Sequence, residues 1–357
     1  MAEPRVLIIG AGLVGSSLGL ALTRTGCHVT LSDSVSSHAL VAAGLGAGHV
    51  GEPRTNDIDL VVVATPPRSI PSVVVDSLRR FPDAIVTDVG SVKASLVDAV
   101  RAGAGEAAAR YVPSHPMAGS QYTGPMTASG DLFVERTWVI TPMASNPREA
   151  VDSVVELAER TGARVVVMEP ERHDEAVAQV SHVPHLMSIL TASHLRAVPG
   201  EHLQLAGQGI RDVTRIAGSD PGLWRQIITA NATAIRAELD EVAEDLAYLT
   251  SVLDQPERLE AFLGLGQAGA EALLVKHGDA LDVLEVTVEI PDEPRALARL
   301  FTDIGDAGFN VEDFELSHDP VRQIGYLTIV VESEVAEQLR GHLERQGWVA
   351  ASSAKEG

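Results

Sequence analysis

Residues 5–15 read RVLIIGAGLVG, and this stretch decides the fold of the first part of the chain. The apolar, largely β-branched run at 6–9 is typical of a strand covered on both faces. Gly10, Gly12 and Gly15 follow as GxGxxG, and a helix-like stretch comes next. In this motif the first glycine allows a tight turn, the second a close approach of phosphate, and the third close packing of helix on strand. The stretch therefore predicts a strand, a turn and a helix that bind a dinucleotide.

An acidic residue stands where the ribose of a dinucleotide would bind. Asp33 follows the second apolar run, roughly 20 residues after Gly10, and its carboxylate would accept hydrogen bonds from the ribose hydroxyls. The same carboxylate repels a 2′-phosphate, and no arginine follows at 34–36, so the sequence predicts NAD rather than NADP. The residues predicted to bind NAD are Gly10, Gly12, Leu13, Val14, Gly15, Asp33, Thr65, Pro66 and Ser91. The last three follow the carboxyl ends of later strands, where open α/β sheets bind ligands.

The order of strand and helix signals predicts three domains. Apolar runs alternate with helix-like stretches at first, which is typical of a doubly wound parallel sheet. These runs lie at residues 5–9, 28–31, 58–63, 84–87, 138–141 and 164–168. We therefore expect an α/β Rossmann-type dinucleotide-binding domain at residues 1–170. Strand signals then vanish, which predicts an all-α substrate and dimerisation domain at 171–278. A βαββα order near the C-terminus predicts a ferredoxin-like α+β module at 279–357.

A regular apolar period marks the clearest helix of the expected all-α domain, over residues 223–253. Its apolar side chains recur about every 3.5 residues, which is typical of a seam against another helix. They are Ile228, Ile235, Leu239, Val242, Leu246, Leu249 and Leu253. Packing within one subunit would explain this seam as well as a partner does. We expect a second copy of the helix across a two-fold axis, and hence a homodimer. Pro256 ends this helix, and a Gly/Ala-rich stretch follows at 264–269.

Charge and cysteine usage exclude several classes of protein. The 357 residues carry 49 Asp and Glu against 27 Lys and Arg, a net charge of -22, so the basic face of a nucleic-acid binder is absent. The single Cys27 excludes an internal disulfide and a cysteine-built metal site, and it fits a reducing cytoplasm. The uncharged run at 6–23 is rich in glycine, which favours a buried strand and helix over a signal peptide or membrane span. We expect a cytoplasmic protein that needs no metal.

Histidine and arginine residues indicate where chemistry takes place. His115 lies in the segment SHPMAGS at 114–120, and imidazole is the side chain best suited to accept a proton near neutral pH. Arg211 and Arg215 share one face of a predicted helix. In an acidic protein, arginines near glycines are typical of a carboxylate clamp, although two surface salt bridges would give the same spacing.

Five motifs, in this order, resemble those of prephenate dehydrogenases, the NAD-linked enzymes of tyrosine synthesis. They are GxGxxG, DxGSxK at 88–93, HPMAG at 115–119, SHxPH at 181–185 and RDxTRIAxSDPxxW at 211–224. The resemblance implies that His115 is the base for the substrate's 4-hydroxyl, that Ser91 assists it, and that Arg215 binds the ring carboxylate. The residues implied or expected to bind the rest of the substrate are His185, Ser120, Gln121, Arg211 and Trp224.

The reaction that the resemblance implies is oxidation and decarboxylation of prephenate to 4-hydroxyphenylpyruvate, with NAD as hydride acceptor. It also implies a dimer joined through the helical domain. The C-terminal module resembles an ACT domain, a fold that commonly binds amino-acid effectors such as tyrosine. Residues 292–295 read DEPR, and Arg295 stands where many ACT domains have glycine, which argues against an effector at the usual position.

Three alternatives follow from the same residues. Arogenate, whose side chain bears an ammonium, would suit an acidic residue where Gln121 stands, so Gln121 and His185 favour prephenate. A non-catalytic sensor of NAD or tyrosine would have no use for a base at His115. A β-hydroxyacid dehydrogenase would need a catalytic lysine on the helical domain, and neither Lys93 nor Lys276 has that setting.

Overall fold

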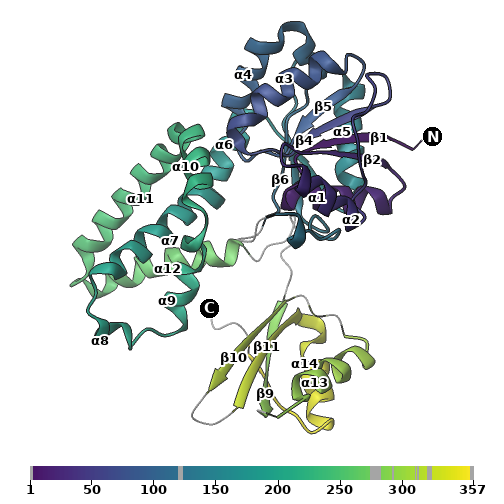
Figure 1. The fold of residues 1–357 in the computed structure, drawn as a ribbon. Coiled ribbons are helices and arrows are strands. Elements are labelled where there is room, and N and C mark those ends of the chain that lie inside the picture. Colours follow the sequence, from purple (N-terminus) through teal and green to yellow (C-terminus); the bar gives the residue numbers. More distant parts are fainter. Residues whose placement is uncertain are drawn as a thin grey trace. The chain divides into compact units, whose positions relative to one another are not determined.

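Parallel strands form the first sheet of this computed structural model, in the order β3-β2-β1-β4-β5 (Figure 1). They are β1 (Arg5–Ile9), β2 (His28–Ser32), β3 (His49–Val50), β4 (Leu60–Val63) and β5 (Ile85–Asp88). The helices of this part are α1 (Leu13–Arg24), α2 (Ser36–Gly44), α3 (Ile70–Arg80), α4 (Ala94–Ala104) and α5 (Arg148–Arg160). The strand order is that of a Rossmann-type fold, which confirms the prediction for this part of the chain.

The structure describes residues 3–119, 124–273, 283–291, 293–309, 311, 313–319 and 324–353. Contacts divide the chain into two units, Met1–Leu246 and Ala247–Gly357. Within the described ranges, no helix has both the length and the apolar character needed to cross a membrane.

Both faces of the parallel sheet are buried. Successive residues of a strand point to opposite faces, so neighbouring residues pack in different cores. Val6 and Ile8 belong to one apolar core, together with Leu22 of α1. Leu7 points the other way and packs in a second core with Val74 of α3. This double burial is why the strands are apolar at nearly every position rather than at every second one.

A three-stranded sheet follows, made of β6 (Ser114–Pro116), β7 (Thr137–Ile140) and β8 (Arg164–Val167). The strands β7 and β8 are parallel, but β6 runs antiparallel to β7, which departs from the purely parallel sheet that the sequence predicts. The sequence also places His115 after a short strand, whereas His115 lies within β6, opposite Val139. The ladder continues on both sides of β6, through Thr141 to Pro113 and Met117 to Thr137, so the histidine backbone is held along its length.

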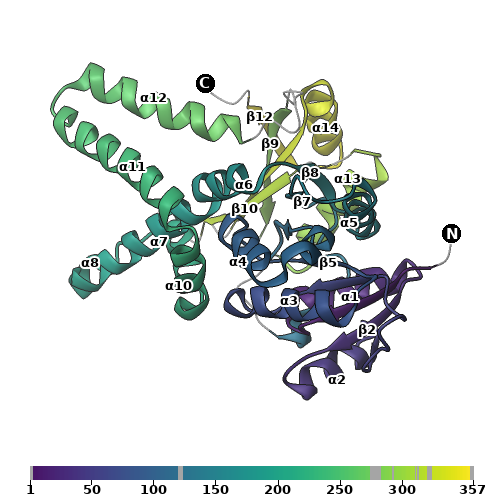
Figure 2. The same ribbon diagram turned by 90° about the horizontal axis from the view of Figure 1, so that it is seen from above.

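Six helices after β8 form the helical region, in which α7 lies against α10 and α11 (Figure 2). They are α6 (Pro170–Val177), α7 (Val183–His194), α8 (Gly200–Leu203), α9 (Gln208–Thr214), α10 (Pro221–Ala230) and α11 (Ala232–Val252), the last of which continues into the second unit. A π-helical turn, Ala178–His182, joins α6 to α7. The 3-10 turns lie at Pro67–Ser69, Gly105–Arg110, Pro125–Thr127, Leu195–Ala197 and Arg215–Gly218.

The structure has two helices, α10 and α11, where the sequence predicts one over residues 223–253. Asn231 separates them, with φ -112° and ψ 27°. Its buried Nδ2 donates to the carbonyl oxygen of Asp174 at 2.7 Å and to Nδ1 of His182 at 3.1 Å. The break therefore serves a tertiary contact, which an apolar period cannot reveal because Asn231 lies off the seam.

The apolar seam divides into a packed half and an exposed half. Ile235 is buried against Ala178 and Val183, and Leu239 is partly buried in the same cluster. Farther along, Leu246 of α11 and Leu253, which follows the end of that helix, are 57% and 63% exposed. The first half of the seam therefore packs within the subunit.

The second unit contains α12 (Pro256–Ala272) and a C-terminal α+β module. Pro256 occupies the first turn of α12, and the Gly/Ala-rich stretch at 264–269 is helical. The elements of the module are β9 (Val283–Pro291), α13 (Ala296–Asp306), β10 (Asp313–Asp319), β11 (Ile324–Glu332), α14 (Ser333–Arg345) and β12 (Val349–Ser353). Its sheet is antiparallel, in the order β10-β11-β9-β12, and its core joins Leu327 of β11 to Leu300 and Leu339 of the two helices. Arg295, before α13, has φ +73°, in the region that favours glycine.

Candidate active site

In the loop after β1, two of the three glycines have no room for a side chain, and the third faces free space. Gly10 has φ +108°, and a Cβ there would lie 2.3 Å from the carbonyl oxygen of Ala64. A Cβ at Gly15 would lie 1.9 Å from the carbonyl oxygen of Gly10, so the helix packs directly on the loop. A Cβ at Gly12 would meet no atom within 4 Å. Free space thus lies before the N-terminus of α1, where unpaired N–H groups bind phosphate.

The other residues predicted to bind the cofactor lie at the ends of β2 and β4 and in the first turn of α1. Asp33 Oδ2 accepts a hydrogen bond from Ala11 N at 2.6 Å, so the carboxylate lies against the glycine loop. Thr65, after β4, has a buried hydroxyl without a hydrogen-bond partner in the described part of the chain. Pro66 is exposed beside it, and Leu13 and Val14 are half-buried on α1. An open glycine, a carboxylate with spare lone pairs and an unpartnered hydroxyl fit a dinucleotide.

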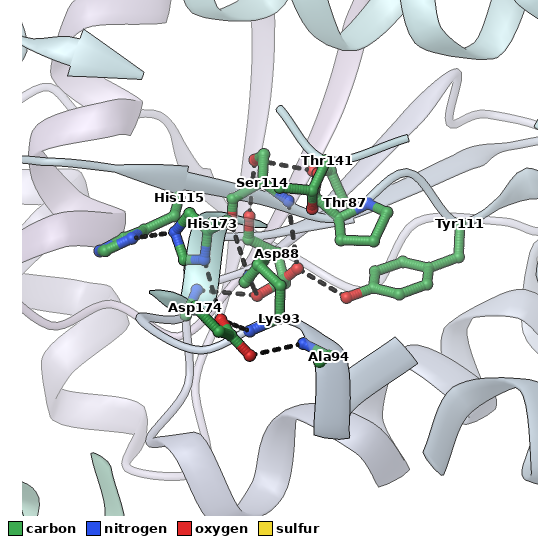
Figure 3. A network of polar contacts seen from close by, with 12 residues as sticks. Thr87, Asp88, Lys93, Ala94, Tyr111, Ser114, His115, Thr141, His173 and Asp174 are labelled. Carbon is green, nitrogen blue, oxygen red and sulfur yellow. Dashed lines mark hydrogen bonds and ion pairs between the residues drawn. The ribbon is translucent and has the colours of Figure 1, made fainter. Parts of the chain in front are cut away.

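Three buried residues from β6 and α6 form a hydrogen-bonded relay (Figure 3). His115 Nδ1 lies 2.9 Å from His173 Nε2, and His173 Nδ1 lies 2.9 Å from Asp174 Oδ1. Because a carboxylate can only accept, His173 carries its proton on Nδ1 and accepts on Nε2. His115 therefore donates from Nδ1 and keeps its lone pair on Nε2. This relay (His115, His173 and Asp174) gives His115 the tautomer of a general base.

Backbone donors at the start of α4 hold the end of the relay. Asp174 Oδ1 accepts from Lys93 N at 2.8 Å, and Oδ2 accepts from Ala94 N at 2.9 Å. The unpaired N–H groups of a helix N-terminus stabilise a negative charge. The residues His173 and Asp174 are only 0% and 6% exposed, so water does not compete for these bonds.

A buried lysine near His115 helps to keep this imidazole neutral. Lys93 Nζ donates to Asp88 Oδ2 at 2.5 Å and to the carbonyl oxygen of Ser114 at 2.7 Å, and burial lowers the pKa of this ammonium (Figure 3). Tyr111 donates its hydroxyl to the other oxygen of Asp88. Burial also lowers the pKa of His115 well below its usual 6.5, and the charges of His173 and Lys93 act in the same direction. The imidazole of His115 is therefore neutral at neutral pH, with the lone pair of Nε2 unprotonated.

A second polar cluster lies between α7 and α10. The imidazole of His185 stacks on the indole of Trp224, with ring centroids 3.4 Å apart and planes 5° apart. His182, at the end of the π-helical turn, points its ring edge-on to the same indole. Asn231 donates to His182 Nδ1, which assigns the proton of this ring to Nε2, and burial lowers the pKa of His182 to about 4. Because Asn231 also donates to Asp174, this cluster and the relay are joined.

The remaining predicted residues lie outside these two hydrogen-bonded clusters. Ser91, in the loop between β5 and α4, lines a pocket of about 270 Å³ together with Gln226 of α10. Arg211 and Arg215 are exposed, and neither forms an ion pair with another residue that the structure describes. Ser120 and Gln121 lie outside the described residues.

The sequence does not predict the roles of His173, Asp174 and Asn231 in these two clusters. His173 and Asp174 are adjacent residues of α6, after β8 and at the start of the helical region. They belong to none of the five motifs. Their significance depends on α6 lying beside both β6 and the start of α4. Residue spacing does not encode this contact.

Comparison with protein families accounts for most of the chain. The nucleotide-binding domain of prephenate dehydrogenase matches residues 18–167, and the dimerization domain of prephenate dehydrogenase matches residues 169–265. The chain belongs to the prephenate dehydrogenase family. The relay crosses from the first matched segment of this family to the second, because His115 lies in one and His173 in the other.

Individual members of the prephenate dehydrogenase family match three quarters or more of this chain. The probable prephenate dehydrogenase NovF of Streptomyces niveus is 32% identical, over 97% of this chain and 99% of that relative. The structure of prephenate dehydrogenase from A. aeolicus in complex with hydroxyphenyl propionate and NAD+ is 25% identical, with a TM-score of 0.69, over 77% of this chain and 99% of that one. The structure of Synechocystis arogenate dehydrogenase is 26% identical, with a TM-score of 0.66, over 75% of this chain and 99% of that one. Relatives of this chain are thus named for two different substrates.

The glycine loop makes opposite predictions for two neighbouring substitutions. Gly12→Ala puts a methyl group into the space expected to hold phosphate, so NAD binding should weaken by about 1–3 kcal/mol, with an unchanged thermal midpoint. Gly15→Ala drives a methyl group into the loop backbone and should lower the midpoint itself. Calorimetric titration with NAD measures the affinity of both variants, and thermal unfolding measures their midpoints. Unchanged NAD affinity in Gly12→Ala would place the phosphates elsewhere.

The buried histidines predict a loss of stability in acid. The pKa values of His115 and His182 are lowered in the folded protein, so below pH 6.5 the unfolded chain binds more protons than the folded one. The contribution of these two histidines to the free energy of unfolding is therefore fully present above pH 6.5. It is lost as the pH falls from there towards 4, by up to about 1.4 kcal/mol per pH unit for each group. His182→Gln should reduce this slope in urea unfolding, and the exposed His202→Gln should not. Equal slopes for the two variants would contradict the assignment.

Proposed function

We propose that this protein is an NAD-dependent prephenate dehydrogenase, which converts prephenate to 4-hydroxyphenylpyruvate and carbon dioxide in the synthesis of tyrosine. The observation that carries the proposal is the relay, which leaves a neutral His115 with its lone pair on Nε2. Membership of the family supports the substrate. The open space at Gly12 and the carboxylate of Asp33 support NAD as the cofactor.

The chain supplies a base and fixes its orientation. NAD held by the glycine loop and Asp33 would supply the acceptor for the hydride at C4 of the substrate ring. His115 Nε2 accepts the proton of the 4-hydroxyl as that oxygen becomes a carbonyl. His173 accepts from His115 Nδ1, and the carboxylate of Asp174 stabilises the positive charge that develops on the two rings. Loss of the C1 carboxylate as carbon dioxide leaves its electron pair in the ring, and the resulting phenolate oxygen takes the proton back from His115.

Exposed arginines support recognition of the two carboxylates of prephenate. The protein has a net charge of -22, so an anionic substrate needs local cations. We infer that Arg215 binds the ring carboxylate in a bidentate manner and that Arg211 lies close by. We infer that Ser91 assists His115 and contacts the cofactor, and that Trp224, Ser120 and Gln121 line the remainder of the substrate site.

Neutral side chains favour prephenate over arogenate, the second candidate substrate. Arogenate carries an ammonium where prephenate carries a keto group. Burial lowers the pKa of His185, so this ring contributes no charge, and Gln121 is uncharged as well. The similarity to an arogenate dehydrogenase keeps arogenate as the substrate against which to compare.

We further infer a homodimer, a regulatory module and a cytoplasmic location. The dimerization domain of the family supports two-fold pairing of the helical region, and so do the exposed Leu246 of α11 and Leu253, which follows that helix. We propose that residues 279–357 are an ACT-like module whose effector is an amino acid such as tyrosine, bound elsewhere than at Arg295. The single Cys27 is buried, which suits a reducing cytoplasm.

Formation of NADH with prephenate and with arogenate tests the proposed function. We expect kcat/KM for prephenate to exceed that for arogenate by about tenfold or more, with NAD preferred over NADP because of the Asp33 carboxylate. The same assay with added tyrosine tests the regulatory module. Absence of turnover with prephenate would contradict the proposal, and a preference for arogenate would correct the substrate.

Replacement of His115 tests the base. His115→Asn should lower kcat by about 10²–10⁴-fold, the usual contribution of a general base, while the affinity for NAD stays unchanged. Because the pKa of His115 is lowered, kcat/KM of the unmodified enzyme should stay high until the pH falls well below 6.5. The exposed His202→Asn is the matched control. A variant at 115 with normal turnover would remove this residue from the mechanism.

A further inference from the structure

One side chain of α10 reaches the loop that follows β4. Gln226 Oε1 accepts a hydrogen bond from Arg68 N at 3.2 Å, and Gln226 Nε2 donates to the carbonyl oxygen of Gly222 at 3.2 Å. Both ends of the amide are therefore used, one within α10 and the other between segments 158 residues apart. Arg68 and Gln226 also border the cavity of about 270 Å³ that Ser91 lines, so their contact lies at the edge of the candidate site.

A short, stiff turn connects this contact to the predicted cofactor site. Thr65 and Pro66 are predicted to bind NAD, and Arg68 follows directly after Pro67. The turn is stiff because each of its two prolines has a fixed φ, and because Ser69 N and Oγ both donate to the carbonyl oxygen of Pro66. A displacement of Pro66 by a bound dinucleotide would therefore move Arg68 N as well.

Helix α10 connects the same contact to the predicted substrate site. Trp224 lies two residues before Gln226 in this helix, and its indole stacks on the ring of His185. At the other end of α10, Asn231 donates to the carbonyl oxygen of Asp174. Two amide side chains thus hold α10 against the rest of the first unit. Of this pair, Gln226 is the one that reaches the loop after β4.

We propose that Gln226 is a positioning residue, which couples the binding of NAD to the binding of the substrate. This inference rests on the proposed function, which assigns the loop after β4 to NAD and Trp224 to the substrate. A ligand that fixes one side of the bond between Gln226 and Arg68 also restrains the other side, so the second ligand meets a site that is already ordered. Linkage makes the effect reciprocal, and each ligand tightens the other by the same factor.

Titration of two ligands, each with and without the other, tests this coupling. The ligands are NAD and 4-hydroxyphenylpropionate, an aromatic compound that has no hydride to give up at C4. Each is titrated calorimetrically into the full chain. In the unmodified protein each ligand should tighten the other by about three- to tenfold, the usual worth of one hydrogen bond. Gln226→Leu has no acceptor for Arg68 N and should reduce that factor to less than about twofold.

Two further variants separate this bond from other roles of the same residues. Gln226→Glu loses the donation to Gly222 but keeps a side-chain oxygen that accepts from Arg68 N, so it should retain the coupling. Arg68→Ala removes the guanidinium and keeps the backbone N–H, so this matched control should retain the coupling as well. Gln226 lies beyond the last of the five motifs, which ends at Trp224, so no motif of the sequence indicates it.

The outcomes separate this inference from the proposed function. Thermal unfolding first establishes that each variant is folded, and Gln226→Ala serves if Gln226→Leu is not. Independent binding of the two ligands to the unmodified protein, undiminished coupling in a folded Gln226→Leu, or an equal loss in Arg68→Ala would overturn the role of Gln226. Turnover is measured independently, and in Gln226→Leu the KM for prephenate should rise about three- to tenfold at unchanged kcat. A protein that shows the coupling but does not oxidise prephenate would refute the proposed function and keep the role of Gln226.

Discussion

Asp174 places its carboxylate against the N-terminus of α4, where Lys93 N and Ala94 N donate to its two oxygens. The same residue accepts from the ring of His173 and, through its carbonyl oxygen, from Asn231. These bonds join the nucleotide-binding segment of the family to the helical segment. They also decide on which nitrogen each ring of the relay carries its proton. A change at Asp174 would thus disturb the arrangement of the helices and the tautomer of His115 together.

A buried ion pair supports the same region from the side of the sheet. Lys93 and Asp88 are both 0% exposed, and their remaining bonds go to Tyr111, Gly90 and the backbone of Ser114. Breaking a buried pair by removing one partner costs about 3–5 kcal/mol, because the other charge remains without compensation. Here each charge has several partners, and the lysine also disfavours a proton on His115. The pair therefore contacts the backbone of β6 and also influences the charge state of His115 in that strand.

The sequence was informative where function depends on a local pattern and uninformative where it depends on a contact between distant segments. The loop of Gly10, Gly12 and Gly15 needs only its neighbours in the chain, and the Rossmann-type fold, the helical region and the family were all predicted from such patterns and are confirmed. The partner of His115 was not predicted, because 58 residues separate it from His173. The antiparallel direction of β6 was missed for the same reason. The helix break at Asn231 follows from bonds to α6 and to the π-helical turn before α7, which no period of apolar residues records. The roles of Ser91, Arg211 and Arg215 stay predictions.

The enclosure of the relay has a consequence for how a turnover is completed. Among the residues that the structure describes, His115 Nδ1 bonds to a ring that is 0% exposed, and that ring bonds to a carboxylate whose oxygens already bond to α4. A proton accepted by His115 Nε2 thus has no exit to bulk water through the relay. In the proposed reaction none is needed, since the oxygen that gives the proton up becomes the phenolate oxygen that takes it back. The base is then regenerated in place, and the proton on the product hydroxyl is the one that the substrate brought, so its exchange with solvent would depend on opening of the substrate side rather than on the protein interior.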